Sequence, residues 1–138
     1  MPDIFFYGTD RLTSSKAIAI ARGQLKASLN DEATTRVLAS QDEVARIVST
    51  GRTVYGVNTG FGILANKPIS EEDTATLQYK ILQSHSVGVG EPIAPEVSKL
   101  MLITKVQSLA QGYSGVQLST LQRIIWHIDN DIIPVVPS

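Results

Sequence analysis

Apolar residues recur at helical spacing along most of this 138-residue chain, with glycine or proline between the successive stretches. Such amphipathic stretches fold as helices because each turns an apolar stripe toward a common core. Between residues 97 and 109 the apolar side chains cover most of the helix circumference, which predicts burial on several sides. The predicted helices begin at residues that can cap them, at Thr13 or Ser14, at Asn30 or Asp31 and at Ser70, and two more begin at Pro95 and beyond Gly115. They end near Gly23, at Gly51, before Gly88, toward Gly112 and at Asp129.

A short β element is predicted near the N-terminus. Residues 4–7, IFFY, are aromatic or β-branched, and the turn-forming residues 8–10 follow them. Hydrophobic residues make up 43% of the chain and charged residues 18%, a balance typical of a globular domain, and no repeat or linker divides the sequence. We therefore expect a mainly α fold with a short β element, in which residues 1–138 form a single segment.

Composition excludes several classes of partner and cofactor. The formal net charge is -1, with no basic run that could follow a phosphate backbone, so nucleic acid is not expected to bind. Cysteine is absent, which excludes disulfides and Cys-ligated zinc, and the other residues show no metal-ligand spacing, so no metal is predicted. Because neither a signal peptide nor an apolar run that could span a bilayer is visible, we expect a cytoplasmic protein without a membrane partner.

The first candidate site is residues 55–62, YGVNTGFG, where three glycines and no regular period indicate a loop of special backbone geometry. Neither this loop nor Gly88-Val89-Gly90 has the Rossmann or P-loop spacing, so a nucleotide is not predicted. Tyr55 could act as a general base only if its surroundings lowered the phenol pKa. Taken alone, Tyr55 is also consistent with an aromatic ring packed in the core.

His85 is the second candidate, because helical spacing places it on the same face as Leu77 and Ile81 and predicts a polar ring pointing inward. A core histidine with satisfied hydrogen bonds would fit the same pattern. The other histidine, His127, and its neighbour Trp126 are assigned to the surface and packing of the last helix. A Gly-x-Ser-x-Gly elbow is absent, so a hydrolytic triad is not predicted.

Three segments, in order and spacing, are similar to those of the aromatic amino acid ammonia-lyases, the family of enzymes that act on histidine, phenylalanine or tyrosine. These segments are residues 55–62 (YGVNTGFG), 83–92 (QSHSVGVGEP) and 108–115 (SLAQGYSG). Residues 133–137, IPVVP, resemble the stretch that leads to the family's cofactor motif. Lys105 and Gln107 depart from the Arg and Asn of many relatives. The resemblance covers nearly the whole chain and implies the N-terminal portion of a helical ammonia-lyase fold.

The resemblance also implies a methylidene-imidazolone, an electrophile that forms in this family from an Ala-Ser-Gly triplet. The sequence has no such triplet: Ala27-Ser28 precedes Leu29, Ala39-Ser40 precedes Gln41, and Ser114-Gly115 follows Tyr113. We expect the triplet just beyond Ser138, which would make this chain an inactive fragment. Activity would then need the remainder of the enzyme, and the resemblance implies a homotetramer whose active sites combine several chains.

By the same resemblance, Tyr55 is the base that removes the β-proton, and Gly60 and Gly62 let the loop approach the substrate. His85 and Ser86 are its substrate-binding contacts, and this pair is similar to the histidine-specific pattern. The parent enzyme is therefore expected to convert L-histidine to urocanate and ammonia, a step of histidine catabolism. A tyrosine or phenylalanine ammonia-lyase, an aminomutase, or a non-catalytic helical module that binds another chain remain as alternatives.

Overall fold

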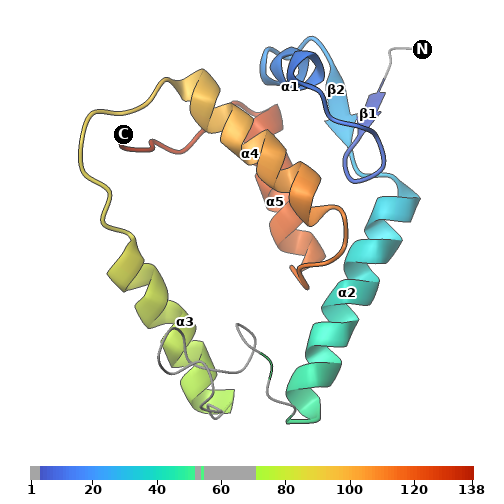
Figure 1. Ribbon diagram of the computed structural model, residues 1–138, viewed down its shortest axis with the longest axis vertical. Coiled ribbons are helices and arrows are strands. Elements are labelled where there is room, and N and C mark those ends of the chain that lie inside the picture. Colours follow the sequence, from blue (N-terminus) through green and yellow to red (C-terminus); the bar gives the residue numbers. More distant parts are fainter. Residues whose placement is uncertain (1–3, 52–53, 55–70) are drawn as a thin grey trace. The chain divides into compact units, whose positions relative to one another are not determined.

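The computed structural model describes residues 4–51, 54 and 71–138 and confirms a mainly helical chain with short strands near its N-terminus (Figure 1). The described elements are β1 (Ile4–Phe6), α1 (Ser14–Ala21), β2 (Lys26–Ser28), α2 (Asp31–Ser49), α3 (Glu71–His85), α4 (Pro95–Leu109) and α5 (Leu118–Asp129). Two compact units are present, one of Met1–Asp42 with Gly90–Ser138 and one of Glu43–Val89. None of the described helices has the length and apolar character needed to cross a membrane.

Strands β1 and β2 pair in parallel, with Ile4 opposite Lys26 and Phe6 opposite Ser28. A tight turn cannot join parallel strands, and α1 supplies the crossover between them. The sequence predicted β1 but not β2, because residues 26–28, KAS, carry little β propensity of their own. Residues 26–28 form a strand because they pair with β1, which precedes them in the chain.

Side-chain caps fix two of the predicted helix starts. The Thr13 hydroxyl accepts a hydrogen bond from the Lys16 amide at 3.3 Å, at the start of α1. At the start of α2, Asn30 Oδ1 accepts from the Ala33 amide at 2.9 Å. Both bonds satisfy amides that lack a partner within the helix. Ser70, the predicted cap of α3, lies outside the described residues.

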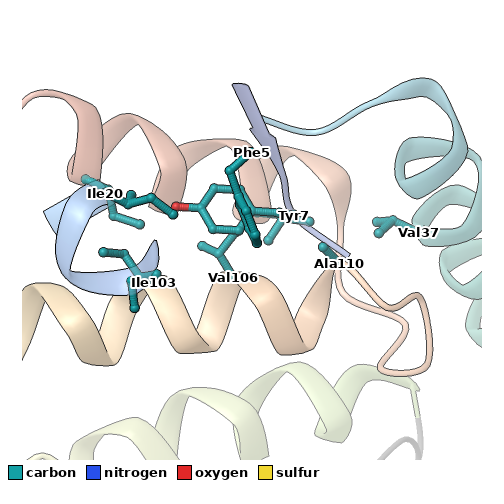
Figure 2. Packing of buried hydrophobic residues seen from close by; sticks show 10 residues of the cluster. Phe5, Tyr7, Ile20, Val37, Ile103, Val106 and Ala110 are labelled. Atoms are coloured by element: carbon teal, nitrogen blue, oxygen red, sulfur yellow. The ribbon is translucent and has the colours of Figure 1, made fainter. Parts of the chain in front are cut away.

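The core of the first unit forms where β1, α1, α4 and α5 meet. The rings of Phe5 and Tyr7 meet edge to face with their centroids 5.5 Å apart, and Ile103 and Val106 of α4 pack beside them (Figure 2). Leu121 of α5 belongs to the same cluster. Burial of these large apolar side chains stabilises the unit, because each removes apolar surface from water.

Helix α4 is buried along one side only. Ser98, Ile103 and Val106 are buried, whereas Val97 and Met101 remain 46% and 49% exposed. The prediction of burial on several sides is therefore wrong for the part of the chain that the structure describes. Sequence periodicity indicated how much of α4 is apolar, but the described elements cover only the face that meets α1 and α5.

The turn that follows β1 is fastened to α4 by Gln107. Gln107 Oε1 accepts from the Gly8 amide at 3.1 Å, and its Nε2 donates to the Asp10 carbonyl at 3.0 Å. Gly8 has φ +82°, and a side chain there would collide with the carbonyl of Ala110. The amide of Gln107 thus supplies both a donor and an acceptor to one tight turn, which gives this departure from the family pattern a structural role.

Candidate functional site

The predicted site residues are described only in part. Tyr55, Gly60 and Gly62 lie outside the described residues. His85 is the last residue of α3, and Ser86 follows with its amide donating to the Leu82 carbonyl at 3.0 Å. Both side chains are exposed.

The ring of His85 is oriented by its own helix. Its Nδ1 lies 3.1 Å from the Ile81 carbonyl oxygen and 2.9 Å from the Ser84 hydroxyl. A carbonyl oxygen can only accept, so the proton of the neutral ring belongs on Nδ1. The lone pair is then on Nε2, which can accept a hydrogen bond from a donor such as a protonated ring nitrogen. This arrangement suits a contact to a polar ring.

The predicted inward direction of His85 is wrong for the described residues. Leu77 and Ile81, on the same face of α3, are partly buried, but His85 is exposed. The reason is its place at the helix end, where the ring folds back onto the last turn and bonds to the carbonyl of Ile81. Helical spacing correctly predicted that Leu77 and Ile81 share a partly buried face, but it could not predict that this burial ends before His85.

The segment after Ser86 leads to a short antiparallel pairing that the sequence did not predict. Pro92 lies opposite Pro137 in an isolated β-bridge. The Ile93 amide donates to the Val136 carbonyl and the Ser138 amide donates to the Glu91 carbonyl, both at 2.9 Å. The sequence did not predict that residues 136–138 pair with the connection between α3 and α4. The only feature of the sequence that indicated non-helical structure in this connection was the glycine and proline content of residues 88–92.

A mostly apolar hollow of about 230 Å³ lies where α4, α5 and the extended C-terminal segment meet. His127 lines it, and its Nδ1 lies 3.0 Å from the Ile132 carbonyl oxygen. Neighbouring Trp126 is 43% exposed, with the Arg123 guanidinium 5.2 Å from its ring centroid. The hollow contains none of the predicted site residues. Within residues 4–51, 54 and 71–138, no cluster of His, Asp or Glu could hold a metal ion.

Comparison with known proteins identifies the family. Residues 12–138 match the family model described as aromatic amino acid lyase. The chain belongs to the aromatic amino acid lyase family. Histidine ammonia-lyase of Vibrio cholerae is 44% identical to this lyase chain over 119 residues, which cover 86% of the chain and 23% of that protein. The lyase chain spans about a quarter of the length of the curated relatives that it matches.

Solved structures share the fold of this lyase chain. The crystal structure of histidine ammonia-lyase from Trypanosoma cruzi has a TM-score of 0.82 and 31% identity, and the match covers 97% of this chain and 26% of that one. Ergothionase from Treponema denticola has a TM-score of 0.89 at 23% identity, over 98% of this chain and 27% of that one, and this likeness shows the fold alone. The mainly helical fold and the family predicted from the sequence are confirmed.

Proposed function

We propose that the complete protein eliminates ammonia from L-histidine to give urocanate, and so acts in histidine catabolism. The observation that carries this proposal is the 44% identity to a histidine ammonia-lyase over 86% of the chain. The 31% identity to a histidine ammonia-lyase of known structure supports it further. The proposal concerns the whole protein, because the chain spans about a quarter of its curated relatives.

Within the chain, Tyr55 is proposed as the base that removes the β-proton of the substrate. Gly60 and Gly62 would let the backbone of that loop approach the amino acid, because glycine has no side chain to intervene. His85 and Ser86 would contact the substrate side chain. The tautomer supported by the Ile81 carbonyl leaves His85 Nε2 as an acceptor for an N–H of the substrate imidazole.

The methylidene-imidazolone would supply the electrophile that activates the amino group for departure. The residues of this chain do not fit its formation, because the sequence contains no Ala-Ser-Gly triplet. The nearest approximations have structural roles instead. Ala27 and Ser28 belong to β2, and the Ser40 hydroxyl accepts from the Gly115 amide at 2.8 Å. We propose that its precursor residues belong to the remainder of the complete protein.

Assembly and location belong to the same proposal. We propose a cytoplasmic homotetramer in which the remainder of the enzyme and other chains complete each active site. Tyrosine or phenylalanine elimination and aminomutase chemistry are the competing activities. The His85-Ser86 pair favours histidine, because a ring that can accept a hydrogen bond suits an imidazole better than a purely apolar ring.

The deciding experiment measures turnover of histidine, phenylalanine and tyrosine by the complete protein and by Tyr55→Phe. We expect histidine to be preferred, and we expect Tyr55→Phe to lower kcat by about two to four orders of magnitude, the loss typical of a missing general base. Tyr79→Phe is the matched control, because Tyr79 is 65% exposed on α3 and should not affect kcat. Preference for another amino acid would reassign the substrate, and absence of any turnover would favour a non-catalytic module.

A further inference from the structure

Three polar atoms meet at the end of α3, within the last turn of the helix. The Ser84 hydroxyl donates to the Ile81 carbonyl oxygen at 3.1 Å, and the same hydroxyl oxygen lies 2.9 Å from His85 Nδ1. Nδ1 in turn lies 3.1 Å from the Ile81 carbonyl oxygen. Each pair of atoms is therefore within hydrogen-bonding distance. All three residues belong to α3, so the helix itself brings these atoms together.

The available protons favour one arrangement of these bonds. A carbonyl oxygen can only accept, whereas a hydroxyl group can donate one hydrogen bond and accept others. If Nδ1 carries the ring proton, it can donate to Ser84 while the Ser84 hydroxyl donates to Ile81. In the other tautomer, Nδ1 and the Ile81 carbonyl oxygen would be two acceptors facing each other at 3.1 Å. Ser84 therefore connects the ring to the main chain and supports the same tautomer as Ile81.

The exposure of His85 makes this second contact matter. Water can compete for a single bond from Nδ1 to the Ile81 carbonyl, and the ring can rotate when that bond opens. A hydroxyl that bonds to both the ring nitrogen and the carbonyl leaves the ring fewer orientations. The backbone beneath the ring is fixed as well, because the Ser86 amide donates to the Leu82 carbonyl at 3.0 Å.

We propose that Ser84 is a positioning residue of the lyase site, which acts through the imidazole of His85. This inference rests on the proposed function, in which His85 contacts the substrate. Ser84 holds the ring proton on Nδ1 and so keeps the Nε2 lone pair available to an N–H of the substrate imidazole. The hydroxyl of Ser84 itself does not enter the reaction.

The kinetic test compares Ser84→Ala, Ser84→Thr and Ser49→Ala in the complete protein. Ser84→Ala should lower kcat/KM for histidine by roughly 2- to 12-fold, the effect of losing one ordinary hydrogen bond. Ser84→Thr keeps a hydroxyl that can bond to a carbonyl of the preceding turn, so it should retain most of the wild-type value. Ser49 is the matched control, because its hydroxyl donates to the Arg46 carbonyl at 2.9 Å at the end of α2, but Thr50 and not histidine follows it. Ser49→Ala should leave kcat/KM unchanged.

Two further measurements separate an effect through His85 from a general structural effect. The Ser84→Ala/His85→Leu double variant should lose no more kcat/KM than His85→Leu alone, because Ser84 acts only through the ring. Nitrogen-15 NMR of the complete protein, labelled at the histidine ring nitrogens and kept at about pH 9 so that imidazole is neutral, reports the tautomer independently of activity. The signals of His85, identified by their absence from His85→Leu, should show a protonated Nδ1 in the wild type and in Ser49→Ala. They should show a mixture of tautomers in Ser84→Ala.

Several results would overturn the role of Ser84 and leave the proposed function intact. These are equal kcat/KM in Ser84→Ala and Ser49→Ala, equal losses in Ser84→Ala and Ser84→Thr, independent losses in the double variant, or an unchanged tautomer in Ser84→Ala. If the wild-type complete protein releases ammonia from none of histidine, phenylalanine and tyrosine, the proposed function fails, and the role of Ser84 in a lyase site fails with it. The NMR comparison then still decides whether Ser84 orients the ring of His85.

Discussion

The ring of His85 is oriented by its own helix, through contacts of Nδ1 with the Ile81 carbonyl and the Ser84 hydroxyl. The ring is exposed, but the Ile81 carbonyl fixes which nitrogen bears the proton. Sequence alone could indicate the His85-Ser86 pair as a substrate contact through its resemblance to the family. It could not predict the tautomer, because the decisive acceptor is a main-chain oxygen whose direction depends on where α3 ends.

Replacing His85 by leucine tests the proposed substrate contact in the complete protein. Leucine fills similar space but cannot accept a hydrogen bond, so kcat/KM for histidine should fall relative to that for phenylalanine. Loss of one good hydrogen bond, about 1 to 3 kcal/mol, corresponds to roughly 5- to 150-fold. His127→Leu is the control, because it removes the bond to the Ile132 carbonyl and should lower the melting temperature without changing that ratio. A fixed substrate ratio in His85→Leu would contradict the assignment.

Tyr7 shows the opposite situation, a polar group held in the core. Burial raises the pKa of the Tyr7 phenol far above its ordinary value of 10.0, and the negative charge of Asp129 raises it further. The unfolded chain therefore ionises first as the pH rises past about 10, while the folded state keeps its proton. Because the unfolded state then binds fewer protons, the stabilising effect is present below pH 10 and is lost above it.

The alkaline dependence of unfolding checks this prediction. Between about pH 10 and pH 11, Tyr7 should contribute a loss of up to about 1.4 kcal/mol per pH unit to the free energy of unfolding. Tyr7→Phe should lose stability less steeply over that range. Urea denaturation at several pH values should show the free energy of unfolding of the wild type falling relative to that of Tyr7→Phe above about pH 10. A difference independent of pH would show that Tyr7 ionises equally in both states.

At the scale of elements, helix caps were among the features that the sequence predicted best. Thr13 or Ser14 and Asn30 or Asp31 were predicted at helix starts, and of these Thr13 and Asn30 accept amide hydrogen bonds there. Caps are local, so four neighbouring residues contain the whole signal. Strand β2 and the bridge at residues 91–93 were not predictable in this way. Each depends on a partner far away in the sequence and on no strong propensity of its own.

Removing the cap of α2 measures its contribution to stability. Asn30→Ala should lower the free energy of unfolding by about 1 kcal/mol, since it leaves the Ala33 amide without its acceptor and removes the bond from Asn30 Nδ2 to the Thr9 hydroxyl. Gln117 is a matched control, because it precedes α5 without any side-chain capping bond. Chemical denaturation should therefore show a smaller effect for Gln117→Ala. Equal losses in the two variants would argue that the Asn30 cap contributes nothing specific.

At the scale of the whole molecule, the family and the mainly helical fold were both predicted from the sequence, and the match to residues 12–138 confirms the family. The candidate site was predicted less completely than the fold. Tyr55, Gly60 and Gly62 lie outside the described residues, so their roles stay predictions. The pattern of a family indicates which residues matter, but distances between catalytic groups depend on how distant segments pack together.

Purified residues 1–138 can be used to test whether activity requires the Ala-Ser-Gly triplet that the sequence does not contain. Because its sequence contains no Ala-Ser-Gly triplet, we expect purified residues 1–138 to show no absorbance band of the imidazolone and to release no urocanate from histidine. Difference absorbance spectroscopy and a urocanate assay would measure both, with the complete protein as the positive control. Turnover by the rigorously purified chain would contradict the expectation and would require a different source of the electrophile.

The opposed prolines have a further consequence for how this chain behaves before it is fully folded. Residues 132–137, IIPVVP, are apolar and β-prone, and an unpaired edge of this kind can recruit a strand from another molecule. Pro134 and Pro137 interrupt the row of N–H donors that such recruitment needs. The segment can therefore pair with residues 91–93 while offering a poor template for continued sheet growth. Pro137, which lies opposite Pro92 in the bridge, and Pro134 thus act as gatekeepers against aggregation.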